Sequence, residues 1–235
     1  MEAIRINKYL SESGVLSRRK ADKAVEEGRV TIDGEVAVLG STVEPGSVVT
    51  RDGQVIGERK KTVIYAYNKP LGLVCTAYEA DKKSLFRTVE FPVKVNYVGR
   101  LDKDSQGLLL LTNDGELSNA IQKARNHHEK EYVVRVDKPL TEEFLKGMRE
   151  GVPILDTVTR PCTVRRHGQN SFKIIITQGL NRQIRRMCEY FGYRVVFLKR
   201  IRVMNVGLGD LAPGEYRELT PEEERILRRD CYNDQ

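Results

Sequence analysis

The sequence predicts an α+β protein with two domains, and three observations support this prediction. A chain of 235 residues can form one large domain or two smaller ones. Residues 1–60 have the pattern of two short helices followed by a small sheet, which is a compact module in itself. Further along, strand-like runs alternate with helical runs, and we assign residues 61–235 to a second, larger domain.

Composition narrows the classes of function. Hydrophobic residues make up 40% of the chain and charged residues 31%, as in ordinary globular proteins. The longest apolar run, 108–111, is too short for a membrane helix. The first residues lack the basic start and apolar core of a secretory signal, so we expect a cytoplasmic location. Four widely spaced cysteines form no zinc or redox motif, which predicts reduced, structural thiols and no metal.

Positive charge is concentrated late in the chain. The net charge is +7, yet the segment 160–202 alone holds eleven Arg or Lys against one acid, Glu189. Such a block repels itself unless an anion meets it, so phosphate contact is favoured over a merely solvated surface. This pattern indicates nucleic acid as the partner.

The N-terminal module contains a helix whose beginning and end are both marked. Ser17 can cap the first turn, and Gly28 can end the helix in a left-handed conformation. Ala21, Ala24 and Val25 recur on one side, which leaves the basic residues free to face outward. A short helix precedes this one, and a strand, a tight Asp-Gly turn and a second strand follow it.

This helix–helix–sheet pattern resembles the small RNA-binding domain first named from ribosomal protein S4. The likeness covers roughly residues 3–50 and includes the run Leu-Ser-Arg-Arg-Lys-Ala-Asp at 16–22. In that family the two helices present basic side chains to structured RNA. The resemblance therefore implies RNA contacts from six residues: Arg5, Lys8, Arg18, Arg19, Lys20 and Lys23.

The second domain follows a polar, Gly-led segment at 57–61 that we interpret as a linker. Its strand-like runs lie at 62–67, 107–112, 131–137, 171–177 and 194–199. Helices are expected at 113–124, 141–150, 181–191 and 221–229. Thr220 and Glu223 form a capping box that opens the last of these helices.

Three arginines stand at the beginning of the helix expected at 181–191, namely Arg182, Arg185 and Arg186. The helix dipole already places partial positive charge there, so an anion should offset them. A guanidinium fork suits either a phosphate or a buried carboxylate.

A carboxylate candidate lies in the segment 99–115. There a polar loop that contains Asp102 and Asp104 comes just before the apolar strand at 107–112. Loops at strand ends often carry catalytic groups, but acidic turns are also common surface features. From chemistry alone, the two interpretations carry equal weight.

The same segment resembles the signature of pseudouridine synthases, in particular the RsuA and RluB/RluE/RluF-type branch that acts on ribosomal RNA. Matching stretches occur at 67–72, 129–132 and 178–187, so the likeness extends over nearly the whole chain. Residues 137–159 and 192–205 are most similar to the RluF-type enzymes of large-subunit ribosomal RNA. The resemblance implies a catalytic domain with a mostly antiparallel mixed sheet flanked by helices.

The resemblance also implies the reaction. Such enzymes detach uracil from its ribose, turn it and rejoin it through carbon, without a metal or redox cofactor. Asp102 matches the catalytic aspartate, Arg185 the basic residue paired with it, and Tyr132 the tyrosine that can stack on the base. Leu198 is expected as the apolar floor under a uridine flipped out of folded RNA. Contacts to the RNA backbone in this domain are expected from Arg100, Arg182 and Arg186.

Two other functions are compatible with parts of the sequence. A non-catalytic RNA-binding ribosome-assembly factor could keep the same scaffold, but the three residues of the expected chemistry are all present. A nucleoside or glycoside hydrolase could use Asp102 and Asp104 as an acid and base pair, but the extended basic surface disfavours a small substrate. We expect a monomeric enzyme of ribosomal RNA, with transfer RNA as a second candidate, and no membrane partner.

Overall fold

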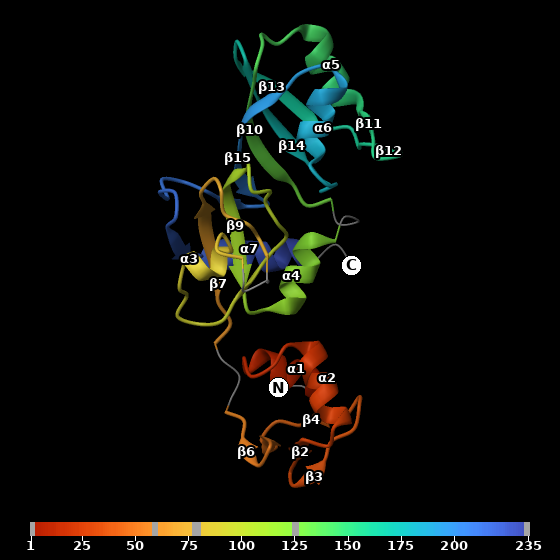
Figure 1. Ribbon diagram of the computed structural model, residues 1–235, viewed down its shortest axis with the longest axis vertical. Helices are drawn as coiled ribbons and strands as arrows, with labels where there is room; N and C mark the ends of the chain where they lie inside the picture. The colour runs from red at the N-terminus through yellow and green to blue at the C-terminus, as the bar shows by residue number, and fades with distance from the viewer. Residues whose placement is uncertain (1–2, 58–60, 77–80, 124–126, 233–235) are drawn as a thin grey trace. The chain divides into compact units, whose positions relative to one another are not determined.

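In the computed structural model, the chain forms two compact units, residues 1–62 and 63–235 (Figure 1). The structure describes residues 3–57, 61–76, 81–123 and 127–232, so most of the segment interpreted as a linker lies outside it. Each unit has a hydrophobic core of its own. Within these ranges, no helix has both the length and the apolar character needed to cross a membrane.

The first unit packs two helices, α1 (Ile6–Glu12) and α2 (Arg18–Glu26), beside small antiparallel sheets. The strands are β1 (Ile4–Arg5), β2 (Val30–Ile32), β3 (Glu35–Val36), β4 (Thr42–Val43), β5 (Val49–Arg51) and β6 (Gln54–Val55). The predicted cap of α2 is present, because the backbone N–H of Lys20 donates to Ser17 Oγ at 3.4 Å. Gly28 follows the helix with φ of +68°. The expected helix–helix–sheet module is confirmed.

One large sheet forms the centre of the second unit. Its strands are β7 (Ile64–Lys69), β8 (Asn96–Tyr97), β9 (Gln106–Thr112), β10 (Lys130–Val136), β13 (Thr163–Gly168), β14 (Ser171–Ile176), β15 (Val195–Val203), β16 (Val206–Gly207) and β17 (Tyr216–Glu218). The main order is β13-β14-β10-β15-β9-β7-β17, with β8 beside β9 and β16 beside β15. Only the pair of β9 and β15 is parallel among these strands. The predicted α+β class with a mostly antiparallel mixed sheet is confirmed.

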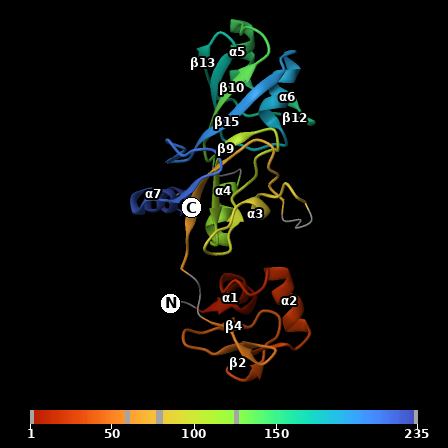
Figure 2. The ribbon, with the colours of Figure 1, turned by 60° about the vertical axis from the view of Figure 1, so that its left-hand side comes forward.

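Helices cover both faces of this sheet (Figures 1 and 2). They are α3 (Leu85–Thr88), α4 (Gly115–Gln122), α5 (Glu142–Glu150), α6 (Gln183–Tyr190) and α7 (Pro221–Tyr232), and a hairpin of β11 (Pro153–Ile154) and β12 (Thr157–Val158) follows α5. Helices α5 and α6 pack on one face at one end, and α4 and α7 pack on the other face at the other end. One core joins α5 and α6 to β10 and β14, and the other joins α4 and α7 to β7 and β9. The four leucines of β9 are all buried because both cores reach that strand.

Two local predictions differ from the structure. The helix expected at 181–191 begins only at Gln183, because Arg182 has a left-handed backbone with φ of +50° and precedes the first turn. Strand β13 was not predicted, because the consecutive polar residues Arg165, Arg166 and His167 hide its alternation. In the structure, β13 pairs antiparallel with β14. This pairing, and not a pattern of alternating apolar residues, makes the segment a strand.

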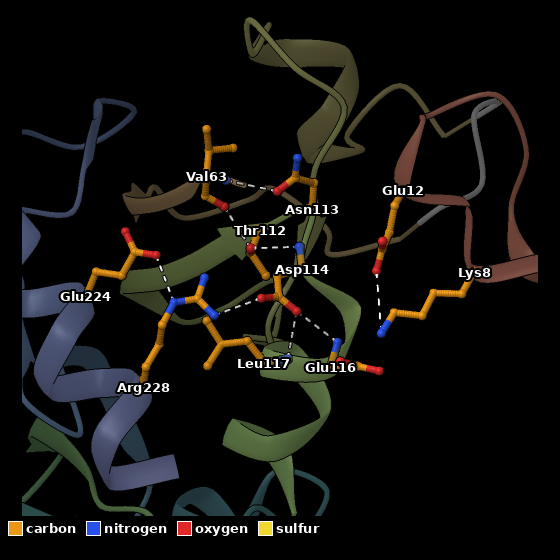
Figure 3. A network of polar contacts seen from close by, with 10 residues as sticks. All are labelled: Lys8, Glu12, Val63, Thr112, Asn113, Asp114, Glu116, Leu117, Glu224 and Arg228. Carbon is orange, nitrogen blue, oxygen red and sulfur yellow. Dashed lines mark hydrogen bonds and ion pairs between the residues drawn. The ribbon is translucent and has the colours of Figure 1, made fainter. Parts of the chain in front are cut away.

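Asp114 joins β9, α4 and α7 in the second unit (Figure 3). Its Oδ1 accepts the N–H groups of Glu116 at 3.1 Å and Leu117 at 2.9 Å, which caps α4. Its Oδ2 lies 2.9 Å from Nη1 of Arg228, which also contacts Glu224 at 2.9 Å. The same turn is tied to the first residue of the unit by the hydroxyl of Thr112, which donates to Val63 O at 2.7 Å.

Replacing Asp114 with alanine is expected to lower the free energy of unfolding by about 1–3 kcal/mol, since it removes both a helix cap and a partly buried ion pair. Denaturant unfolding measures the change. Glu224→Ala is the control, because it removes only the other, more exposed partner of Arg228 and should cost about 0.5 kcal/mol or less. Equal losses in the two variants would contradict the joining role of Asp114.

Candidate active site

A cleft of about 700 Å³ opens in the second unit. It is lined by the loop that leads into β9, by β10 and β15, and by the segment that leads into α6. The register of the sheet explains why these segments meet. Tyr132 of β10 pairs with Arg200 of β15, and Arg200 pairs in parallel with Gly107 at the beginning of β9. The loop before β9 therefore ends next to β15, the strand whose Arg200 pairs with Tyr132.

Most of the residues expected in the catalytic domain line this one cleft, namely Arg100, Asp102, Tyr132, Arg182, Arg185 and Leu198. Tyr132 and Leu198 are buried in its wall, with 8% and 6% of their surface exposed. Arg186 is not among the lining residues. Its guanidinium donates instead to the backbone and side-chain oxygens of Asn181, at 3.1 and 3.3 Å.

The six residues expected to contact RNA from the first unit lie on β1, α1 and α2. Arg5, Arg18, Arg19 and Lys20 are exposed. Lys8 lies 3.9 Å from Glu12, and Lys23 lies 3.7 Å from Glu27. Each pair joins residues four positions apart, one pair on α1 and the other at the end of α2, and such pairs contribute little to stability.

The loop that carries Asp102 is held by backbone contacts on several sides. The ammonium of Lys69, a fully buried side chain, donates to Ser105 O at 2.8 Å. The N–H of Gly72 donates to Lys103 O at 2.9 Å, and the N–H of Ser105 donates to Asp102 O at 3.0 Å. The carboxylate of Asp102 is left one-third exposed and faces a solvent-accessible cleft. A fixed backbone with a partly exposed carboxylate is a suitable arrangement for an attacking or proton-accepting group.

Arg182 and Arg185 both lie near the acidic loop, but they contact different groups there. In the structure, Nη1 of Arg182 lies 3.9 Å from Asp102 Oδ2 and 3.7 Å from Asp104 Oδ2. Arg185 donates instead to backbone oxygens, to Asp104 O at 2.6 Å and Val195 O at 3.2 Å. The pairing of Arg185 with the Asp102 carboxylate, which the family resemblance implies, stays a prediction.

Arg185 remains a charged neighbour of the loop. Burial lowers the pKa of its guanidinium, as does the nearby charge of Arg182, while Asp104 and Asp102 oppose the change. Its Nε atom is buried with no hydrogen-bond partner within the described structure. Asp104 itself is well exposed, with 64% of its side chain accessible, and it supplies the loop with a backbone acceptor.

Known proteins share both units of this chain. A family model described as RNA pseudouridylate synthase matches residues 63–190, and an S4 domain model matches residues 4–49. The dual-specificity RNA pseudouridine synthase RluF of Escherichia coli strain K12 is 51% identical over 223 residues, which cover 94% of this chain and 77% of the relative. This chain belongs to the RNA pseudouridine synthase family.

Other members of the family agree with this assignment. Ribosomal small subunit pseudouridine synthase A of Yersinia pestis is 34% identical over 226 residues, covering 94% of this chain and 96% of the relative. A crystal structure of a pseudouridylate synthase matches with a TM-score of 0.70 at 30% identity, covering 95% of this chain and 99% of that one. The predicted enzyme class, an RNA-modifying isomerase of RsuA/RluF type with an N-terminal S4 domain, is confirmed.

The pseudouridine synthase cleft contains cations that the sequence did not single out. Lys130 and Arg200 lie on the same wall as Tyr132 and Leu198. Their donors meet backbone oxygens: Lys130 Nζ bonds to His128 O at 3.0 Å, and Arg200 Nε bonds to Leu108 O at 2.7 Å. Burial and the charge of Arg200 lower the pKa of Lys130 to about 8. Both cations thus lie beside Tyr132, with donors bonded to backbone oxygens.

The buried lysines were missed for a common reason. Lys69 is the last residue of β7, and Lys130 is the first residue of β10. The sequence does not show whether a lysine at the end of a strand is buried or exposed. The only available signal was their place in the matching stretches at 67–72 and 129–132. Burial of an ammonium without a carboxylate is costly, and such a residue is seldom retained for stability.

Replacing Lys130 with methionine is expected to raise the free energy of unfolding at pH 7 by about 1–2 kcal/mol, because it removes a desolvated charge. In the wild type, the charged Lys130 lowers the free energy of unfolding by its full amount below about pH 8. Between pH 8 and pH 10.5 only the unfolded chain keeps the proton, so this loss of stability disappears as the pH rises. The gain in Tm should therefore shrink between pH 7 and pH 10.

Differential scanning calorimetry at several pH values measures this difference. Lys146→Met is the matched control, because 74% of that side chain is exposed and its removal should change Tm by about 1 °C or less. A Tm difference for Lys130→Met that stays constant from pH 7 to pH 10 would contradict the interpretation.

Proposed function

We propose that this pseudouridine synthase converts a uridine of large-subunit ribosomal RNA to pseudouridine, with Asp102 as its catalytic residue. The observation that carries the proposal is the cleft itself. It brings the partly exposed carboxylate of Asp102 to a wall formed by Tyr132 and Leu198. An apolar and aromatic wall fits a flipped base, and a carboxylate beside it can act on the sugar.

In the proposed reaction, the bond between N1 of uracil and C1′ of ribose breaks, and a bond between C5 and C1′ forms. Asp102 either attacks C1′, forming an ester bond that breaks when C5 bonds to C1′, or takes a proton from C2′ of the ribose and returns it when the new bond forms. The base turns in the cleft against Tyr132, whose hydroxyl is proposed to assist loss of the C5 proton. N1 regains a proton, so the atoms balance without any co-reactant.

The cations around the cleft are proposed to hold the distorted RNA. Arg182 lies beside both acidic side chains of the loop, with its Nη1 3.9 Å from Asp102 Oδ2 and 3.7 Å from Asp104 Oδ2. Arg185 is proposed to act chiefly by fixing the backbone of the loop, since its contacts are to Asp104 O and Ser105 Oγ. Arg100 is an exposed cleft residue and is proposed to contact phosphate.

The first unit is proposed to bind RNA through α1 and α2. Support comes from the match to an S4 domain and from the exposed cluster of Arg18, Arg19 and Lys20 at the beginning of α2. The proposed substrate is RNA of the large subunit, and transfer RNA is proposed as a second substrate. A relative named a dual-specificity enzyme supports more than one target. We further propose that the protein acts as a monomer.

Release of tritium from RNA labelled at C5 of uridine tests the proposal. Large-subunit RNA, small-subunit RNA and transfer RNA are assayed separately with the full chain. The expected result is release from large-subunit RNA that approaches one equivalent, and absence of release from small-subunit RNA. Release from small-subunit RNA alone would contradict the proposed substrate, and no release from any of the three would contradict the proposed chemistry.

A further inference from the structure

The sheet of the second unit has a face that the cleft does not use. At the end formed by β13, β14, β10 and β15, helices α5 and α6 pack on one face (Figures 1 and 2) and bury Val164, Phe172 and Ile174. Tyr132 pairs with Ile174 and belongs to the same core. Side chains alternate along a strand, so the residues between these ones project from the opposite face. We call this opposite surface the outer face.

A row of cations crosses the outer face. The register places Arg165 of β13 opposite Lys173 of β14, Lys173 opposite Val133 of β10, and Val133 opposite Lys199 of β15. Arg165 is exposed, and Lys173 and Lys199 are half-buried. Adjacent strands lie about 4.8 Å apart, so the row spans roughly 14 Å. A fourth cation, Arg135, lies on the same face with its guanidinium over the ring of Phe197.

This row is not neutralised by the chain itself. Within the part of the chain that the structure describes, Arg165, Lys173 and Lys199 form no ion pair within 4.0 Å. The carboxylate on this face, Glu131, is held by Arg202 at 2.9 Å, and Arg202 also holds Glu129 at 2.8 Å. Like charges directly opposite each other destabilise a sheet. The placement of Arg165 opposite Lys173 therefore costs stability until an anion arrives.

The spacing of charge on the outer face favours one kind of anion. The phosphates of a nucleic-acid duplex present regularly spaced negative charge to a row of cations. Single-stranded RNA is usually held by stacking on exposed aromatic rings. The ring on this face, Phe197, is half-buried and lies beneath Arg135, so it offers no free platform.

We propose that the outer face binds the phosphate backbone of an RNA duplex, as a second contact surface separate from the cleft. It holds a helical part of the substrate outside the modified nucleotide and reads no sequence. The proposal requires that the chain acts on RNA, but not that the modified uridine lies in the large subunit.

The test uses the full chain and a fluorescein-labelled RNA duplex of 24 base pairs that contains no uridine. Arg165→Gln, Lys173→Gln and Lys199→Gln are combined in one variant. The control variant combines Lys146→Gln, Arg194→Gln and Arg225→Gln, which removes the same charge from exposed side chains that have acidic partners. Fluorescence anisotropy gives the affinity as a function of salt concentration.

The outer-face variant is expected to bind the duplex about 10- to 100-fold more weakly at 0.1 M salt, and its log–log salt dependence should become shallower by about 2–3. The control should change by less than about threefold. Tm of the outer-face variant should equal or exceed the wild-type value, because like-charge repulsion is relieved.

Equal losses in the two variants would overturn the proposal, because they indicate a general effect of net charge. Unchanged duplex binding by the outer-face variant would also overturn it and would favour an acidic protein as the occupant of this face. Tritium release with large-subunit RNA is measured in parallel, where the expected change is a higher KM at an unchanged kcat. Failure of wild-type release would count against the proposed substrate alone, since duplex binding does not depend on it.

Discussion

Replacing Asp102 with asparagine is expected to lower the rate of uridine isomerisation by about 10⁴-fold or more, with RNA affinity within about threefold of wild type. Asparagine keeps the size of the side chain but removes the negative charge that must stabilise or attack the sugar. One-third of the Asp102 side chain is exposed, and the surrounding loop is held by Lys69, Gly72 and Arg185 through backbone atoms. The exchange should therefore leave the fold unchanged.

Asp104→Asn is the matched control for this prediction. Asp104 lies two residues away, near the same guanidinium of Arg182, and 64% of its side chain is exposed. Its contact with Arg185 is made by the backbone oxygen, which the substitution retains. The rate should fall by less than about tenfold. Single-turnover tritium release measures both variants, and an Asp104→Asn loss as large as that of Asp102→Asn would contradict the assignment of the chemistry to Asp102.

The sequence predicted those parts of the fold that are determined locally. The Ser17 cap and the capping box of Thr220 and Glu223 each depend on residues within two turns of a helix. The capping box appears in full, with the Thr220 N–H and the Glu223 N–H each bonded to the other side chain. Such signals need no knowledge of the rest of the chain.

Features set by distant partners could not be predicted in the same way. Strand β13 follows from pairing with β14, and its sequence shows no clear alternation. In the site, Asp102, Tyr132 and Leu198 were placed together from the family resemblance, and the structure does bring them to one cleft. The position of Arg182 beside the carboxylates could not be predicted, because the helical pattern extends across this residue, whereas its backbone is left-handed and precedes the first turn.

Replacing Gly107 with alanine is expected to destabilise the second unit by about 3–5 kcal/mol, the combined effect of backbone strain and a steric clash. Gly107 has φ of +103°, which side-chain-bearing residues rarely adopt. An added Cβ would lie 2.2 Å from Arg200 O and 2.8 Å from Arg200 N. Both are backbone atoms of β15, so the clash cannot be relieved by turning a side chain. Tm should fall by about 6–15 °C.

Gly207→Ala provides the control, because Gly207 also pairs with β15, yet its Cβ would meet nothing within 4 Å. The free energy of unfolding of that variant should stay within about 1 kcal/mol of wild type.

The Gly107→Ala substitution should also reduce activity at temperatures where the chain is still folded. Gly107 lies at the end of the Asp102 loop and pairs with Arg200 of β15, and Arg200 in turn pairs with Tyr132 of β10. A wider gap between β9 and β15 would therefore move the Asp102 carboxylate away from the wall that is proposed to bind the base. A Gly107→Ala enzyme with wild-type Tm and wild-type tritium release would contradict this prediction. It would show that the close pairing of β9 and β15 is not what positions Asp102.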